Sequence, residues 1–322
     1  MRAGSGHTSR LRFDIRMASV ASTMPARGAF AAADYGLFGG TVLVWGTTWL
    51  ALKYQLGTVD PQVSIVWRFL IAAPLMFLVC RLAGQPILFP LRMHLRFAAL
   101  GLFFYSTNFI LFYNAGHYVV SGLLSVIFSM ASLTNIALAV LLLGEPLRGR
   151  VAFGALLGLG GVALMFWHEV DRTGPGAGPL VGLGLGFLGC LSFSTGNVLA
   201  ARIQRDGVSV LSANAWGVTY GVAVNAVVAL AAGSAFIIEP TSRYVFSLLW
   251  LAIPGSVIAF WMYLALLGRI GADRAGYTTV LSPVLALLVS TLVEDYRWSA
   301  PAIAGLVLVA IGNVLVLMRR RG

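Results

Sequence analysis

The segment that decides the fold is residues 62–80, which read QVSIVWRFLIAAPLMFLVC. Arg68 is the only charged residue in this stretch. An α-helix needs about 20 apolar residues to cross the hydrocarbon core of a bilayer, whereas a transmembrane β-strand shows about 10 residues of alternating pattern. The segment therefore predicts a transmembrane helix that carries one buried cation.

Nine further segments of the same kind follow one another along the chain. The whole sequence is 59% hydrophobic and only 10% charged, whereas a soluble domain has about 25% charged residues. Lipid must therefore be the solvent, and backbone amides in lipid require helices or a closed barrel. We predict an all-α integral membrane protein of ten transmembrane helices. The expected spans are 37–56, 62–80, 97–115, 119–143, 151–168, 179–200, 211–233, 245–267, 275–293 and 301–318.

The basic residues indicate how these helices are oriented. The chain has 22 Lys and Arg against 11 Asp and Glu, a net charge of +11. With both termini in the cytoplasm, seventeen of the basic residues fall on the inner side and three on the outer side. This bias follows the positive-inside rule, so we attribute the charge to topology and expect no nucleic-acid partner. Residues 1–34 are Arg-rich without the apolar core of a signal peptide, which predicts a disordered cytoplasmic tail.

The two halves of the chain resemble each other in one register. Similar residues or motifs recur at a separation of 148 to 150 positions in four of the five predicted helix pairs. They include Trp67 with Trp216, Glu145 with Glu294, and Tyr113 with Tyr263. We therefore predict two repeats, residues 35–170 and 179–318. Because five helices is an odd number, the second repeat would start on the opposite side of the membrane, as in many transporters whose site lies between inverted repeats.

Motifs in both halves resemble the EamA-type permeases of the drug/metabolite transporter superfamily. They are Val44-Trp-Gly-Thr-Thr-Trp-Leu-Ala-Leu-Lys53, Trp67-Arg-Phe69, Leu141-Leu-Leu-Gly-Glu-Pro146 and Leu281-Ser-Pro-Val284. The resemblance implies a multi-pass carrier of the inner (plasma) membrane that moves amino acids or other small metabolites, often outward. It also implies a central cavity lined by spans 1–4 and 6–9. The family usually has a proline in span 4 near Ser132 or Thr134, so here we expect a straighter helix.

Two cations within the spans are the leading candidates for a substrate site. Lys53 lies near the outer end of span 1, and Arg68 lies about 10 Å into span 2 at 1.5 Å per residue. Intramembrane charges usually face the bundle interior or water. A carboxylate or phosphate on the substrate could pair with both Lys53 and Arg68. Two alternatives stay open: Lys53 could reach the headgroups, and Arg68 could organise backbone carbonyls.

Aromatic and amide side chains complete the candidate substrate-binding set. Trp and Tyr at span ends are commonly interface anchors, and mid-span amides commonly bond across helices, so these alternatives also stay open. Together with the two cations, the candidates are Trp45, Trp49, Trp67, Tyr105, Asn108, Asn197, Trp216, Tyr220 and Trp261. The glycine pairs Gly154/Gly158 and Gly182/Gly186 have the spacing of close helix packing.

The sequence contains neither a nucleophile–base pair nor clustered metal ligands, so we expect no catalytic residue, metal site or cofactor. No Asp or Glu lies near the middle of a predicted span, which argues for a facilitator or exchanger over a proton-coupled carrier. The function predicted is a secondary transporter, an exporter or facilitator, of amino acids or related carboxylated metabolites, whose partners are its substrate and the bilayer. A carrier for phosphorylated or drug-like compounds, a membrane enzyme, a non-transporting protein and a homodimer remain alternatives.

Overall fold

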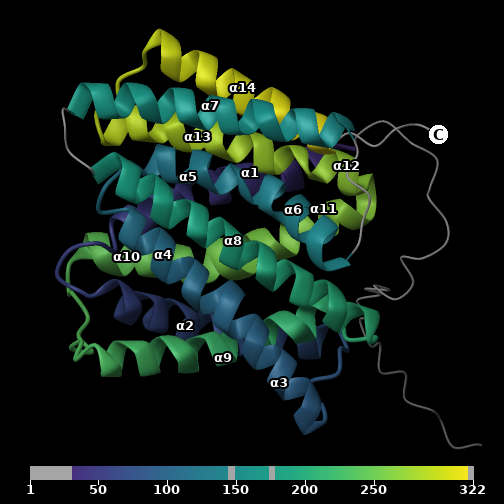
Figure 1. The fold of residues 1–322 in the computed structure, drawn as a ribbon. Helices are drawn as coiled ribbons and strands as arrows, with labels where there is room; N and C mark the ends of the chain where they lie inside the picture. The colour runs from purple at the N-terminus through teal and green to yellow at the C-terminus, as the bar shows by residue number, and fades with distance from the viewer. Residues whose placement is uncertain (1–30, 144–148, 174–177, 318–322) are drawn as a thin grey trace, which may run out of the picture.

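The computed structural model describes residues 31–143, 149–173 and 178–317, and within these ranges every regular element is a helix (Figure 1). Most of the predicted tail, and Glu145 of the repeat pairing, lie outside the described residues. Seven helical stretches are long and apolar enough to cross a membrane, and two shorter apolar helices follow them. The prediction of an all-α, multi-pass membrane protein is confirmed.

The helices follow the predicted spans closely. Two long helices each contain a π-helical segment: one runs through α3, η1 and α4, and the other through α10, η2 and α11. Helices α5 and α6 together fill predicted span 4. The bounds are α1 Ala32–Lys53, α2 Pro61–Leu82, α3 Leu91–Leu100, η1 Gly101–Thr107, α4 Asn108–Ala115, α5 Ser121–Ser129, α6 Ala131–Leu143, α7 Gly149–Thr173, α8 Gly178–Arg205, α9 Val210–Ala231, α10 Ser242–Trp250, η2 Leu251–Ile258, α11 Ala259–Ile270, α12 Ala272–Ala275, α13 Tyr277–Val293 and α14 Ala300–Leu317.

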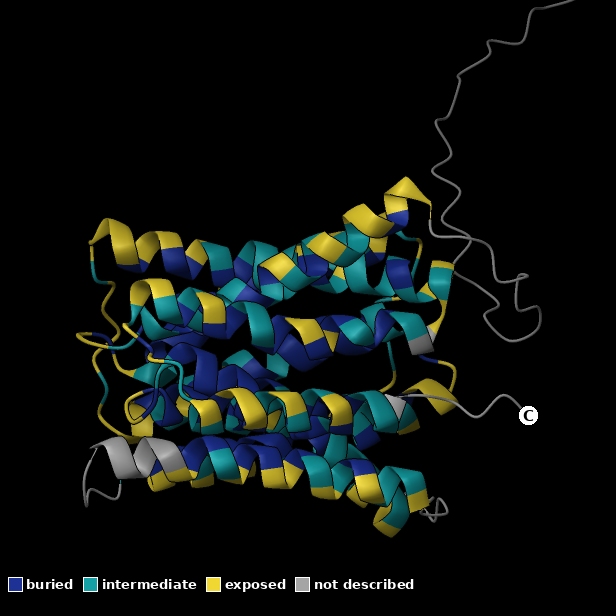
Figure 2. Ribbon diagram, turned by 90° about the horizontal axis from the view of Figure 1, so that it is seen from above, coloured by how far each residue is buried: buried dark blue, intermediate teal, exposed yellow. Residues whose placement is uncertain are grey.

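The helices form a bundle with two paired flanks. Figure 1 shows α7 beside α14 on one flank and α2 beside α9 on the other, and both pairs pack extensively. Between the flanks, α1 packs on α13 and α11, while α8 packs on α4 and α6. Figure 2 shows buried residues on the inward faces of the helices and exposed residues along the outward faces. Many exposed residues are large and apolar, such as Leu292 and Leu141, as expected for a surface that lipid covers.

Glycines allow the α7–α14 flank to pack backbone against backbone. A methyl group at Gly154 would lie 2.7 Å from the carbonyl oxygen of Gly312, and one at Gly161 would meet the carbonyl oxygen of Gly305. Gly158 lies on the same side of α7, where its backbone approaches Gly312. Small residues permit this approach in membranes, where packing rather than the hydrophobic effect holds helices together. The predicted packing role of Gly154 and Gly158 is confirmed.

The second predicted glycine pair packs in the same way. A methyl group at Gly182 would lie 2.9 Å from a methyl of Val119, and one at Gly186 would lie 2.6 Å from a methyl of Ile127. Both contacts join α8 to the fourth predicted span and the turn before it. The packing role predicted for this pair is therefore also confirmed.

The fourth predicted span is interrupted although it lacks a proline, contrary to the straighter helix we expected. Helix α5 ends at Ser129 and α6 begins at Ala131, with Met130 between them. The hydroxyl of Ser129 donates to the carbonyl of Val126 at 2.6 Å, and the thiol of Cys190 on α8 donates to the carbonyl of Ile127 at 3.3 Å. Side-chain donors that compete for helix carbonyls can bend a helix. Here they produce the interruption that proline produces elsewhere.

Candidate substrate-binding pocket

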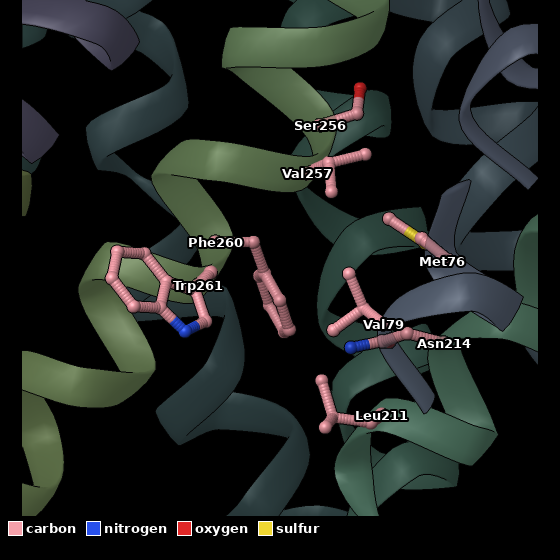
Figure 3. Close-up of a pocket in the computed structure, with 8 residues that line it drawn as sticks. All are labelled: Met76, Val79, Leu211, Asn214, Ser256, Val257, Phe260 and Trp261. Atoms are coloured by element: carbon pink, nitrogen blue, oxygen red, sulfur yellow. The ribbon is translucent and has the colours of Figure 1, made fainter. Parts of the chain in front are cut away.

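A pocket lies between α2, α9 and the η2–α11 helix (Figure 3). Six apolar and two polar side chains line it, and in this conformation they enclose a narrow space of about 20 Å³. The eight lining residues are Met76, Val79, Leu211, Asn214, Ser256, Val257, Phe260 and Trp261. Of the residues predicted from sequence, Trp261 lines the pocket directly, and Arg68 and Tyr105 reach it through the two polar residues.

Arg68 is bonded to the pocket residue Ser256. Its guanidinium donates from Nε and Nη2 to the Ser256 hydroxyl oxygen at 3.2 and 3.1 Å. That hydroxyl in turn donates to the carbonyl of Leu251 at 2.8 Å. Ser256 lies in the π-helical segment η2, which also contains Pro254. Proline has no N–H to donate to the regular hydrogen bonds of an α-helix. π-Helical segments often occur at functional sites.

The guanidinium of Arg68 is deeply buried without an acidic partner. The side chain is only 6% exposed, and its guanidinium carbon lies 4.7 Å from the ring centroid of Phe109. Among the described residues, no carboxylate lies within ion-pair distance of Arg68, and the buried hydroxyl of Tyr113 lies close enough to its guanidinium to interact with it. A buried charge is costly unless it is paired, so this arrangement favours an anion that arrives from outside the chain.

The other polar residue of the pocket, Asn214, is held by Tyr105. The Tyr105 hydroxyl donates to Oδ1 of Asn214 at 2.8 Å, and both side chains are buried. The sequence predicted Tyr105 as a substrate contact, and in the structure its hydroxyl is bonded to a residue that lines the pocket. We did not identify Asn214 or Ser256 from the sequence, because each is one of many small polar residues within apolar helices.

Lys53 lies apart from the pocket. Its ammonium donates to the carbonyl oxygens of Gly116 and of Val119, the latter at 2.9 Å, where α4 ends. Glu294, at the end of α13, is close enough to attract it electrostatically. The same carboxylate accepts from the backbone N–H of Ser121 at 3.0 Å, at the start of α5. Cations favour helix C-termini and anions favour N-termini, so this group stabilises the turn between α4 and α5.

Two predicted tryptophans lie at helix ends instead of in the pocket. The indole N–H of Trp67 donates to the carbonyl of Ile237 at 3.0 Å, and that of Trp216 donates to the carbonyl of Ile87 at 2.9 Å. Tyr220, one turn beyond Trp216, has its hydroxyl 3.1 Å from Nδ1 of His94. The two tryptophans thus attach connecting segments to α2 and α9, and Tyr220 joins α9 to α3.

The remaining candidates face other helices of the bundle. Trp45 packs on Tyr263 of α11 with ring centroids 5.2 Å apart, and Trp49 packs on Phe112 and Phe128. Asn197 donates to Asn135 at 3.0 Å. The amide of Asn108 donates to its own helix at 3.3 Å, and its Oδ1 is buried without a hydrogen-bond partner among the described residues. None of these four residues lines the pocket.

The fold is that of a polytopic membrane protein in which a buried cation, Arg68, lies beside an apolar pocket. A model of the EamA-like transporter family matches residues 35–167 and 180–318, so the chain belongs to that family. It is therefore a membrane transport protein and not an enzyme.

Relatives with similar sequences are named as transporters. A protein of Escherichia coli (strain K12), named a probable amino-acid metabolite efflux pump, is 25% identical over 292 residues that cover 87% of this chain and 94% of that protein. An uncharacterized transporter of Buchnera aphidicola subsp. Schizaphis graminum (strain Sg) is 36% identical over 87 residues, which span 27% of this chain and only 29% of that protein. A crystal structure at 19% identity matches with a TM-score of 0.63, covering 89% of this chain and 96% of that one, which supports the fold.

Proposed function

We propose that the protein is a secondary transporter that carries amino acids or related small carboxylated metabolites out of the cell by alternating access. One observation carries the substrate class: the guanidinium of Arg68 is buried beside an apolar pocket and, among the described residues, has no carboxylate partner. A planar guanidinium matches a carboxylate in geometry and charge. The apolar lining would take the rest of the metabolite. The name of the E. coli relative agrees with this proposal.

Alternating access would follow from an inverted repeat of ten helices with both termini in the cytoplasm. Paired features support such a repeat. The Trp67–Ile237 and Trp216–Ile87 bonds both join the two halves, and the repeat relates one bond to the other. The π-helical segments η1 and η2 begin 150 residues apart, and the family model matches the chain twice. Two repeats that rock about a site between them would expose it to each side in turn.

A carboxylate fits this site better than a phosphate does. Phosphate sites generally gather several donors around three oxygens, whereas this pocket has one guanidinium, one hydroxyl and one amide. We also propose the inner membrane as the location, since the E. coli and Buchnera relatives are bacterial proteins named as transporters. Facilitated diffusion or exchange is the mode we propose, because no Asp or Glu lies mid-span.

Counterflow in proteoliposomes tests the proposal. Vesicles loaded with a mixed pool of unlabelled amino acids should take up labelled single amino acids saturably, without effect of a protonophore. Arg68→Gln should weaken the apparent affinity by at least tenfold, and amino-acid amides, which lack the carboxylate, should not exchange. Arg243→Gln is the matched control, because Arg243 lies at the start of α10, 13 residues before Ser256, and stacks on Tyr54 at 3.9 Å. Equal exchange by wild type and Arg68→Gln would refute the carboxylate site.

A further inference from the structure

The carboxamide of Asn214 is oriented by Tyr105. In the structure its oxygen accepts the hydroxyl hydrogen of Tyr105 at 2.8 Å. The nitrogen end must then point the other way. Figure 3 shows this nitrogen directed into the pocket, toward Phe260 on α11.

The two N–H donors of this amide have no hydrogen-bond partner among the described residues, and the nitrogen faces the pocket. Water or a ligand in the pocket can therefore accept from them. Asn225, another buried amide of the same helix, shows the usual arrangement. Its nitrogen donates to the carbonyls of Tyr105 and Gly221 at 3.0 and 2.7 Å, and its oxygen accepts from Ser106 at 3.0 Å. Asn225 joins helices and does not line the pocket.

The two polar groups of the pocket lie at separate positions with apolar side chains between them. In Figure 3, Ser256 lies at one end and Asn214 toward the other, with Val257, Phe260 and Met76 between. Arg68 supplies positive charge at the Ser256 end. The Asn214 end presents N–H donors to the pocket, so an oxygen acceptor on a ligand would pair with it.

We propose that Asn214 is a substrate-selecting residue: its amide donates to a neutral oxygen acceptor on the part of the substrate remote from the carboxylate, and Tyr105 is its positioning residue. The proposal rests on the proposed transport function and adds a second point of recognition. The preferred substrate class is a carboxylated metabolite with an apolar middle and a carbonyl, amide or sulfoxide oxygen beyond it. Sites built to hydrogen-bond a substrate group discriminate against analogues that lack it, because their own polar groups are then left unpaired.

Methionine and methionine sulfoxide form a matched pair of probes, since they share one carboxylate and differ by one neutral oxygen acceptor. Competition by each against labelled methionine is measured in counterflow. Wild type should favour the sulfoxide, and Asn214→Leu should reduce that preference by about 2- to 10-fold, the range of one neutral hydrogen bond. Tyr105→Phe should give a smaller reduction, because the amide can then rotate. Arg68→Gln should weaken both probes alike and keep their ratio.

Binding to the purified protein separates this inference from the transport proposal. Hexanoate and 5-oxohexanoate differ in one ketone oxygen and need no transport to be compared by calorimetry. A preference for the ketone in wild type that is lost in Asn214→Leu and reduced in Tyr105→Phe supports the assignment even if no amino acid exchanges. Equal binding of the two acids by wild type, or a preference that persists in both variants, overturns it. Asn225→Leu is the structural control: it should lower stability and leave the ratio unchanged.

Discussion

Replacing Glu294 by Gln should destabilise the turn that joins α4 to α5. The Glu294 carboxylate accepts from the backbone N–H of Ser121 at 3.0 Å and from the Ser290 hydroxyl at 2.6 Å, and it also accepts from the Ser121 hydroxyl. Lys53 adds electrostatic attraction. The glutamine keeps the size of the side chain but loses the charge, and its nitrogen can no longer accept.

The magnitude follows from these contacts. A hydrogen bond to a charged group contributes about 1.5–3 kcal/mol, against about 0.5–1.5 kcal/mol for a neutral one. An anion at a helix N-terminus contributes a further 0.3–1 kcal/mol or so. Since one oxygen of Gln can still accept, we expect a loss of roughly 2–3 kcal/mol. Thermal unfolding of the detergent-solubilised protein, followed by fluorescence-detected size exclusion, measures it.

Asp295→Asn is the matched control for this experiment. It removes the same charge one residue further on, where the side chain is exposed, and Asn tolerates the left-handed backbone at φ 54°. We expect Asp295→Asn to unfold with the wild type and Glu294→Gln to unfold at a clearly lower temperature. A double-mutant cycle with Lys53→Met then gives the coupling between the two side chains. Equal stability of the two single variants would refute the capping role.

Three further perturbations test the packing. Gly161→Val should destabilise the α7–α14 flank by about 1–3 kcal/mol or prevent folding, because the new Cβ would meet a carbonyl oxygen of α14. Gly160→Val is the control: a Cβ at position 160 has no atom within 4 Å, so this variant should have little effect on thermal stability. Thr134→Val, which removes a 2.6 Å hydroxyl bond to α8, should lower the free energy of unfolding by about 1–3 kcal/mol in the same assay. Trp67→Phe and Trp216→Phe should each cost a similar amount, about 1 kcal/mol, since each loses one indole bond to a loop carbonyl; a large difference between them would contradict their equivalence.

The helices were predictable because membrane solvation imposes a strong pattern. The segment 62–80 became α2, Pro61–Leu82, with a proline in its first turn. The interruption at Met130 was missed because we looked for proline, whereas hydroxyl and thiol donors produced it. Those donors come partly from α8, so the signal lay in tertiary contacts that span 4 alone does not contain.

The pocket was harder to predict than the helices. Ser256 follows Arg68 by 188 positions and Asn214 follows Tyr105 by 109, so each bond depends on which helices pack together. From the sequence, Trp67 and Trp216 could each be part of a cavity wall or an interface anchor. Only their hydrogen bonds to loop carbonyls distinguish these two roles. Trp261, which was predicted to face the cavity, does line the pocket and is 51% exposed.

The two cations within the predicted spans differ in what already neutralises them, and this difference is why we propose Arg68, and not Lys53, as the substrate-binding charge. Lys53 is bonded to two backbone carbonyls at a helix C-terminus and lies near the carboxylate of Glu294. Arg68 is bonded to one hydroxyl, whose own hydrogen is donated to Leu251. Because burial penalises an unpaired charge, the free energy gained by neutralising Arg68 remains available to an incoming anion. A carboxylate that binds Arg68 in only one conformation of the bundle would shift the conformational equilibrium toward that conformation.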